Sequence, residues 1–345
     1  MRIIHTADIH LDSPLAGVAN SAQRRHELLT ALANLAEYAA NNGVEAVVIA
    51  GDLFDEQFTT EQTVRSVADI VQGSKAAWFV LKGNHGGSQP YTRLKQLCAD
   101  INFFGDEWTT YSLGGVSICG RELGQNDYEQ WGKLSLDKSA FNILVLHGDI
   151  DDASYGLIDR KAIAASNASY VALGHRHAFC PHKFGAVKGC YSGVLEARGF
   201  DETAETGFVL IDTDSGEIRF VPQAIRRVET VTVDIGSVTS DIALQKKILD
   251  AVAEISPRNY LNLTLTGEVQ EDLHIDLVAQ QALGGKFFAL RLKDATTLRV
   301  DIDKLSQEVS LRGEFVKLAS AIEDKRLRDE VLRLGLSYLS GEVKA

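Results

Sequence analysis

Polar side chains that can bind divalent metal ions recur directly after short apolar segments in the first half of the chain. They form the patterns Asp-x-His, Gly-Asp, Gly-Asn-His, His-Gly and His-x-His. The candidate ligands are Asp8, His10, Asp52, Asn84, His147, His175 and His177. Imidazole, carboxylate and amide groups without a thiolate suit Mn, Fe or Zn better than Ca. The pattern therefore predicts a metal centre that gathers residues from several separate segments.

Each of these residues taken alone has an ordinary structural explanation. A single Asp at a strand end is usually a turn residue, and a single His is usually a surface or hydrogen-bonded core residue. That interpretation suits His5, His26, His182 and His274. The i, i+2 pairs differ, because both side chains of an extended Asp-x-His or His-x-His segment point to the same side. All the strand-end patterns occurring together therefore favour a site.

The segments that carry these residues predict a layered α/β fold. From the start to about residue 200, short apolar runs alternate with amphipathic helical stretches. Helices are predicted over 21–42 and 60–72, and buried strands over 44–50, 76–81, 141–146 and 170–173. Ligands in α/β sheets bind beyond the carboxyl ends of the strands, so the polar residues are expected to converge in one crevice.

The pattern changes after Arg226-Arg227, which indicates more than one domain. We expect a catalytic domain over 1–227, a smaller α+β domain over 228–303 and a helical segment over 304–345. The last segment is rich in charges, with Leu and Val at helical spacing. Its apolar face either packs on its own domain or forms a docking surface for another chain.

Composition limits the class of protein. The chain has 345 residues, of which 45% are hydrophobic, and 35 Lys and Arg against 47 Asp and Glu give a net charge of −12. This balance argues against a protein that coats nucleic acid nonspecifically, although it leaves room for a local basic groove. The basic residues considered for phosphate contact are Arg24, Arg25, Lys82, Arg121, Arg160, Lys161, Arg176 and Arg198.

The cysteines and the apolar runs indicate where the protein works. Four cysteines without a C-x-x-C pair are expected to be reduced and mostly buried, rather than disulfides or zinc ligands. The apolar runs fall far short of the roughly 20 residues that cross a bilayer. The first residues resemble a core strand and lack the features of a signal peptide. We therefore expect a cytoplasmic protein that does not bind membranes.

The motifs together resemble a known family. Asp8-x-His10, Gly51-Asp52-x-x-Asp55, Gly83-Asn84-His85, His147 and Gly174-His175-x-His177 are similar to the motifs of the calcineurin-like metallophosphoesterase superfamily. The opening residues 5–14, the stretch 191–202 and the closing residues 311–315 resemble the SbcD-type DNA repair exonucleases, within them the YhaO-like group. The resemblance implies a four-layer α/β/β/α sandwich with a smaller α+β capping domain and C-terminal helices.

The resemblance also implies roles for the residues. It implies two divalent ions, manganese above all, with Asp8, His10 and His177 at one and Asn84, His147 and His175 at the other. A carboxylate is the natural bridge between two ions, and we assign that role to Asp52. A bridging hydroxide would attack phosphorus, His85 would act as general acid, and Asp55 would orient His85. The family usually has an acidic residue where Gly86 stands here.

Three functions remain open at this point. The first is a two-metal phosphodiesterase that hydrolyses DNA, for which the resemblance implies a homodimer and an SbcC-type coiled-coil ATPase partner. The second is a phosphatase or phosphodiesterase for a small molecule, a nucleotide or a lipid, which the acidic net charge favours slightly. The third is a non-enzymatic adaptor with a degenerate site, against which the complete set of ligands argues.

Overall fold

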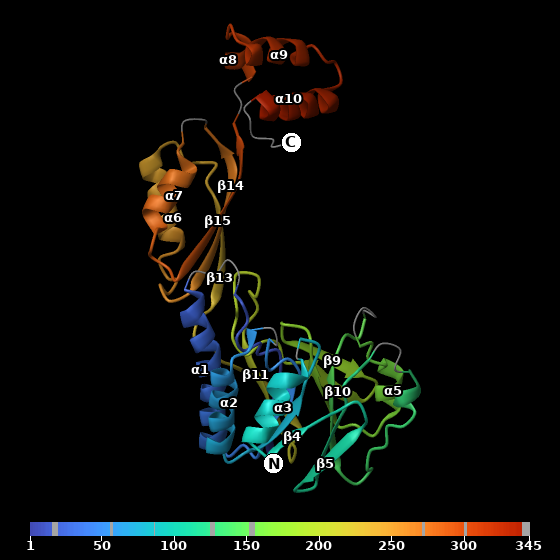
Figure 1. Cartoon of the computed structure of the whole chain (residues 1–345). Helices are drawn as coiled ribbons and strands as arrows, with labels where there is room; N and C mark the ends of the chain where they lie inside the picture. The colour runs from blue at the N-terminus through green and yellow to red at the C-terminus, as the bar shows by residue number, and fades with distance from the viewer. Residues whose placement is uncertain are drawn as a thin grey trace. The chain divides into compact units, whose positions relative to one another are not determined.

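The structure is a computed structural model that describes residues 1–15, 20–55, 58–85, 87–124, 128–151, 156–270, 273–299 and 302–339 (Figure 1). Gly86, the position of the departure noted above, lies outside these residues. The chain divides into two compact units. Unit 1 comprises residues 1–230, 255–262 and 285–291, and unit 2 comprises residues 231–254, 263–284 and 292–345. The predicted boundaries after residues 227 and 303 stay predictions.

The first sheet of unit 1 has six strands in the order β12-β11-β1-β2-β3-β4. Its parallel strands are β1 (Arg2–Thr6), β2 (Ala46–Ala50), β3 (Ala77–Leu81) and β4 (Ile101–Phe103). Its antiparallel strands are β11 (Gly207–Asp212) and β12 (Glu217–Pro222). Every residue of β2 is buried, as expected of a parallel strand that is covered on both faces.

The second sheet also has six strands, in the order β5-β6-β7-β8-β10-β9. The parallel strands are β6 (Val116–Gly120), β7 (Phe141–His147), β8 (Tyr170–Gly174) and β10 (Val187–Tyr191). The antiparallel edge strands are β5 (Thr109–Leu113) and β9 (Cys180–Phe184). The sequence did not predict these edge strands, because their residues alternate between partly buried and exposed positions instead of forming an apolar run.

Three hydrophobic cores hold the two sheets and the helices of unit 1 together. Apolar side chains from both sheets, among them Val48, Phe79 and Val145, form one core between the sheets. On the outer face of the first sheet lie α1 (Ser21–Asn41), α2 (Glu61–Gly73) and α3 (Ser88–Leu97). On the outer face of the second lie α4 (Tyr128–Trp131) and α5 (Arg160–Ala165). The predicted α/β/β/α order is confirmed.

Helix α2 forms where its sequence signals predict it. Its apolar residues Val64, Val67 and Val71 are buried on one face, and the side chain of Thr60 accepts a bond from the backbone N–H of Thr63 at 3.1 Å. Helix α1 begins differently. Asn20, the residue before its first turn, has a left-handed backbone and makes no capping bond through its side chain.

The remaining elements follow β12 along the chain. They are β13 (Val228–Asp234), α6 (Asp241–Ala251), β14 (Tyr260–Val269), α7 (Ile275–Leu283) and β15 (Ala289–Leu298), then α8 (Ile302–Ser306), α9 (Leu311–Ser320) and α10 (Lys325–Leu339). Strands β13, β14 and β15 form a three-stranded sheet in that order. The last three helices bury Val316, Leu332 and Leu336 together. No helix in the described ranges is long and apolar enough to cross a membrane.

Candidate metal centre

The loops that follow the parallel strands run beside one another at the strands' carboxyl ends. After β1 and β2, the N–H of Asp8 donates to the carbonyl of Gly51 at 3.1 Å, and the N–H of His10 donates to that of Asp52 at 2.9 Å. In the second sheet, the N–H of Gly148 donates to the carbonyl of Gly174 at 3.2 Å. Backbone bonds therefore hold the segments that carry the predicted ligands in register.

The backbone at this edge adopts a conformation that non-glycine residues rarely take. The φ angles of Asp8, His10, Asp52 and His175 are 53°, 49°, 54° and 109°. Such conformations cost free energy and persist only where the surrounding structure enforces them, which is common at functional sites. The strain therefore falls on residues that the sequence assigned to the metal centre.

Two glycines make room for the polar side chains. A Cβ at Gly51 would lie 2.1 Å from Nδ1 of His147, and a Cβ at Gly83 would lie 2.4 Å from Oδ1 of Asp52. Both glycines also have positive φ angles, 102° and 85°. The glycines in the Gly-Asp and Gly-Asn-His patterns are thus required by close packing as well as by backbone conformation.

The predicted ligands gather into two groups that could each hold a metal ion. One group contains Asp8, His10 and His177, and the other contains Asp8, Asp52 and His147, with ligand atoms within 4.8 Å of one another in each. Asp8 is common to both groups. Asp52 reaches both as well, because its Oδ2 lies 3.8 Å from Nε2 of His10 and 3.3 Å from Nε2 of His147. The bridging role of Asp52 stays a prediction.

The other predicted residues lie around these groups. Oδ1 of Asn84 is 2.7 Å from Nε2 of His147, and the ring centroids of His147 and His175 are 5.4 Å apart. The His85 ring lies 5.0 Å from that of His10. The structure thus brings Asn84 and His175 to the second group and His85 to the first.

Asp55 differs from the other predicted residues. Its backbone bonds to Leu11 and Phe58. Among the described residues, however, its carboxylate makes no hydrogen bond or ion pair with His85, whose N–H donates instead to Oδ1 of Asp52 at 2.9 Å. The role of Asp55 in orienting His85 stays a prediction that this geometry does not support.

Burial and charge act in opposite directions on the central ion pair. Burial alone would raise the pKa of Asp52, but the charge and hydrogen bond of His147 lower it to about 2. Burial alone would lower the pKa of His147, but Asp52 and Asp8 raise it to about 9. The Nδ1 of His147 lies 2.9 Å from the carbonyl of Ala50, which orients Nε2 toward the other ligands.

His10 provides a test of whether these residues fit a metal ion. Burial lowers the pKa of His10 to about 3, so the ring is neutral at physiological pH. Among the described residues, neither of its ring nitrogens has a hydrogen-bond partner. A buried polar atom without a partner is costly, and metal coordination removes that cost. The nitrogen and oxygen donors of the site, together with the buried His10 ring that lacks hydrogen-bond partners among the described residues, therefore fit a divalent cation.

Two carboxylates that the sequence did not single out support the ligands. Glu122, which follows β6, accepts hydrogen bonds from the N–H groups of Lys82 and Gly83, just before Asn84. Burial raises the pKa of Glu122. Glu202 contacts the ring of His177. No local pattern marks Glu122, while Glu202 lies at the end of the stretch 191–202 noted in the sequence.

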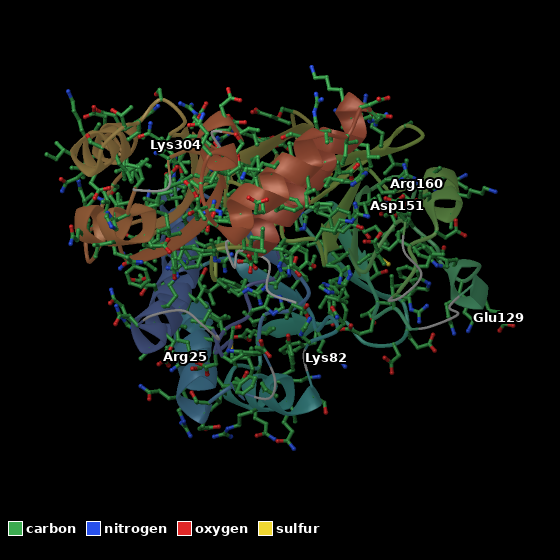
Figure 2. The ribbon with its side chains drawn as sticks, turned by 90° about the horizontal axis from the view of Figure 1, so that it is seen from above. Arg25, Lys82, Glu129, Asp151, Arg160 and Lys304 are labelled. Carbon is green, nitrogen blue, oxygen red and sulfur yellow. The ribbon has the colours of Figure 1, made fainter. Side chains whose placement is uncertain are left out.

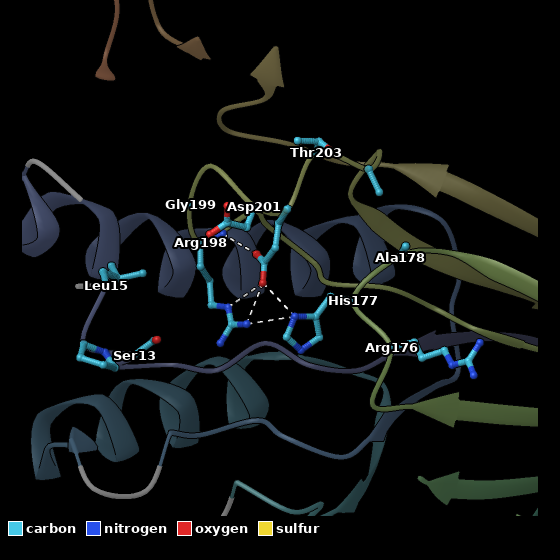
Figure 3. Close-up of a pocket in the computed structure, with 12 residues that line it drawn as sticks. Ser13, Leu15, Arg176, His177, Ala178, Arg198, Gly199, Asp201 and Thr203 are labelled. Atoms are coloured by element: carbon cyan, nitrogen blue, oxygen red, sulfur yellow. Dashed lines mark hydrogen bonds and ion pairs between the residues drawn. The ribbon is translucent and has the colours of Figure 1, made fainter. Parts of the chain in front are cut away.

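A pocket of about 710 Å³ lies beside the first group (Figure 3). Its lining includes His177 and Arg198, together with Ser13 and Leu15 from the segment after His10. Figure 3 shows Arg198 reaching toward His177. The pocket therefore adjoins the predicted metal centre and provides space for a substrate.

Several basic residues considered for phosphate contact are engaged elsewhere. Arg24 is fully buried and donates to Glu27, to Glu196 and to the carbonyl of Ala197. Arg121 is buried as well. Both residues are therefore unsuited to phosphate contact, which corrects the expectation from sequence.

The remaining basic residues are spread over unit 1. Figure 2 shows Arg25, Lys82 and Arg160 well apart from one another. Arg176 donates to the carboxylate of Asp149 at 2.9 and 2.7 Å. Arg176 and Arg198 line the same pocket beside the first group of ligands.

Comparisons with curated proteins find distant relatives. The chain is 24% identical over 299 residues to the uncharacterized metallophosphoesterase YhaO of Bacillus subtilis, covering 79% of this chain and 73% of that one. It is 24% identical over 358 residues to the DNA double-strand break repair protein Mre11 of Methanosarcina mazei, covering 98% of this chain and 55% of that one. It is 22% identical over 312 residues to the D component of the SbcCD nuclease of Staphylococcus epidermidis, covering 77% and 79%.

The chain thus spans about half the length of the Methanosarcina protein. A family model described as calcineurin-like phosphoesterase matches residues 1–179. That range is more than half of the chain, and it contains every predicted metal ligand, from Asp8 to His177. The chain belongs to the calcineurin-like phosphoesterase family.

Proposed function

We propose that the chain is a two-metal phosphodiesterase that hydrolyses DNA phosphodiester bonds, as a DNA repair exonuclease or endonuclease subunit. The main support is that relatives named for DNA repair and nuclease activity align with 77% and 98% of the chain. The gathering of carboxylates and imidazoles at the strand ends supports the hydrolytic chemistry. Calcineurin-like phosphoesterases are dimetal-dependent hydrolases.

The proposal assigns a ligand set to each ion. Asp8, His10 and His177 would hold one ion, Asn84, His147 and His175 would hold the other, and Asp52 would lie between them. Bound divalent cations supply Lewis-acid chemistry, which polarises the phosphate and activates water. Manganese is our proposal for the metal, with Fe and Zn compatible with the same nitrogen and oxygen donors.

His85 is the proposed general acid. Its side chain is exposed, and its ring lies 5.0 Å from that of His10, so it borders the metal centre from the solvent side. An imidazole in that position can protonate the leaving alkoxide, a role that typically contributes about 10²- to 10⁴-fold to the rate. His85 therefore combines access to solvent with proximity to the candidate metal ligand His10.

The test compares substrates and variants in the presence of Mn. Linear duplex DNA, single-stranded DNA and a small aryl phosphodiester are each incubated with the wild-type chain, Asp52→Ala and His85→Ala. We expect DNA hydrolysis by the wild type and its loss in both variants. His26→Ala, which alters an exposed histidine of α1, is the matched control and should retain the activity. No metal-dependent hydrolysis of any substrate by the wild type would contradict the proposal.

Asp55 has its own test, because only the sequence supports its role. If Asp55 orients His85, then Asp55→Asn should shift the basic limb of the pH–rate profile, since that limb reports the general acid. A profile unchanged from that of the wild type would remove Asp55 from the catalytic residues. The rest of the proposal does not depend on this result.

A second candidate is hydrolysis of a small-molecule or nucleotide phosphoester by the same centre. The observation that favours it is the pairing of arginines near the pocket with acids, Arg176 with Asp149 and Arg198 with Glu202. Such pairs offer little uncompensated positive charge to a long polyanion. Turnover of the aryl ester with intact DNA would support this alternative.

We propose that the chain acts with other subunits in the cytoplasm, as a homodimer bound to an SbcC-type coiled-coil ATPase. The name of the Staphylococcus relative denotes one part of a larger nuclease. Helices α9 and α10 expose apolar side chains that suit a protein partner, namely Leu311, Leu318, Leu327, Leu334 and Tyr338. Light scattering gives the mass of the chain in solution, and co-purification with such an ATPase tests the partner. A monomer that binds no ATPase would contradict this assembly.

A further inference from the structure

The carboxylate of Glu202 is fully engaged beside the first group of ligands. Its Oε1 lies 2.9 Å from Nδ1 of His177 and accepts bonds from Nε and Nη2 of Arg198 at 2.9 and 2.7 Å. Its Oε2 accepts the backbone N–H of Arg198 at 2.7 Å. Because both of its oxygens accept bonds from N–H groups of Arg198, Glu202 acts as a hydrogen-bond acceptor at this position.

Two side chains compete for one nitrogen of His177. Nη2 of Arg198 lies 3.0 Å from Nδ1 of His177, and Oε1 of Glu202 lies 2.9 Å from the same atom. The guanidinium can only donate, so it would need a bare Nδ1, whereas the carboxylate can only accept and needs an N–H there. These two bonds require different tautomers of the ring and cannot both form at once.

The tautomer decides whether His177 can bind a metal ion through Nε2. A neutral imidazole carries one N–H, so a proton on Nδ1 leaves the Nε2 lone pair available to a cation. A bond from Arg198 to a bare Nδ1 would place the proton on Nε2 and block that lone pair. His177 belongs to the same group of candidate ligands as His10, and the centroids of the two rings are 5.3 Å apart. A blocked Nε2 would therefore remove one donor from this group.

We propose that Glu202 is a positioning residue that holds the His177 ring with its proton on Nδ1 and thereby prepares Nε2 for the first metal ion. This inference rests on the proposed two-metal centre and adds to it a residue that none of the sequence motifs assigned. Carboxylate support of a ligating histidine fixes the ring and raises its basicity. Arg198 is expected to weaken metal binding, because its positive charge lies beside His177 and its Nη2 can donate to the same Nδ1.

The experiment measures Mn binding by calorimetry and elemental analysis, without any phosphoester substrate. The wild type should bind two ions. Glu202→Ala should weaken one of the two sites by about 10- to 100-fold, the usual effect of removing such a partner, and leave the other unchanged. Glu202→Gln should restore most of the lost affinity, because its amide oxygen can still accept from Nδ1.

Two further variants separate positioning from general stability. Arg198→Ala removes the same ion pair with Glu202 but keeps the acceptor for His177, so it should bind Mn at least as tightly as the wild type. Glu205→Ala removes an exposed glutamate of the same segment and should bind Mn like the wild type. Thermal melting of each variant in EDTA establishes that it is folded.

The outcomes distinguish this inference from the proposed function. If the wild type binds two ions and Glu202→Ala binds them equally well, Glu202 has no positioning role and the metal centre stands. If Arg198→Ala shows the same loss as Glu202→Ala, the ion pair rather than the acceptor matters, and the inference is overturned. If Glu202→Ala does not fold, the other two variants are used instead. Near wild-type Mn affinity of both Glu202→Gln and Arg198→Ala supports the inference, and a loss of Mn affinity in Arg198→Ala overturns it. A wild type that binds no ions contradicts the proposed function itself.

Discussion

Oε2 of Glu122 accepts a hydrogen bond from the backbone N–H of Gly83 at 3.2 Å. Glu122 follows a strand of the second sheet, and Gly83 follows β3 of the first. The bond therefore fixes the loop that presents Asn84 and His85 from the side of the opposite sheet. Because the bond involves backbone N–H groups, the support acts on the whole loop rather than on one side chain.

Removal of Glu122 is expected to loosen that loop. Glu122→Ala leaves the N–H groups of Lys82 and Gly83 without their acceptor, which should cost about 1–3 kcal/mol of the free energy of unfolding and lower kcat. Glu122→Gln keeps an acceptor oxygen and should lose less of both. Urea denaturation and steady-state kinetics provide the measurements. Glu107→Ala, at an exposed glutamate, is the control, and equal effects at both positions would refute the role.

Gly83→Ala is expected to damage the metal centre directly. The added Cβ would lie 2.4 Å from Oδ1 and 2.7 Å from the backbone N of Asp52, and φ is +85°. Gly43→Ala has a similar φ of +63° but nothing within 4 Å, so it should show only the backbone cost, about 1–2 kcal/mol. Thermal denaturation and Mn-dependent hydrolysis compare the two. Full activity of Gly83→Ala would contradict the prediction, because it would mean that the loop after β3 can shift to accommodate the added Cβ.

His10 and His5 are expected to respond in opposite ways to replacement by leucine. In EDTA, His10→Leu should melt at or above the wild-type temperature, because it removes buried ring nitrogens that have no hydrogen-bond partner among the described residues. His5→Leu should melt lower, since His5 bonds to the hydroxyl of Tyr170 at 2.8 Å and the carbonyl of Leu173 at 3.2 Å. Mn should stabilise the wild type and His5→Leu equally and His10→Leu less, because only the ion held by the second group of ligands can still bind fully. Equal Mn stabilisation of His10→Leu and the wild type would contradict the role of His10 as a ligand.

Glu27 on α1 should make the stability of the fold depend on pH under acidic conditions. Burial alone would raise the pKa of Glu27, but hydrogen bonds from Arg226 and Arg24 lower it from 4.5 to about 2. The ionised carboxylate therefore stabilises the fold above pH 4.5, and this stabilisation is lost as the pH falls from about 4.5 to about 2.

The measurement is the free energy of unfolding in urea across that pH range. The wild type should lose stability more steeply than Glu27→Gln as the pH falls, because glutamine cannot take up the proton. Glu37→Gln changes an exposed glutamate of the same helix and should retain the wild-type slope. Parallel slopes for the wild type and Glu27→Gln would show that Glu27 does not contribute to the acid sensitivity.

The sequence predicted those parts of the site that follow from local pattern. An apolar run that ends in Gly-Asp or His-x-His specifies both a strand and the residues at its carboxyl end, so the candidate ligands that the structure brings together could be named from the sequence. The fold class followed from the alternation of strands and helices. The edge strand β5 was not predicted, because its residues alternate between partly buried and exposed positions and form no apolar run.

Contacts between distant segments were not predictable from one sequence. Arg24 and Glu27 are three residues apart on one helix, which usually indicates an exposed ion pair. Arg24 is nevertheless buried, because Glu196, far along the chain, forms a second ion pair with it. Glu122 and Glu202 are comparable, since their importance depends on which backbone or ring they meet rather than on their neighbours in sequence.

The candidate metal centre draws its residues from both sheets, and this has a consequence during synthesis of the chain on the ribosome. Asp8 emerges early, whereas His177 and Glu202 emerge only after most of unit 1 has been translated. A nascent chain therefore cannot assemble the first group of ligands until its second sheet is nearly complete. A truncated product that ends before β8 would contain Asp8, His10 and Asp52 but lack both residues of the His-x-His motif, and would have no complete centre with which to act on a phosphoester.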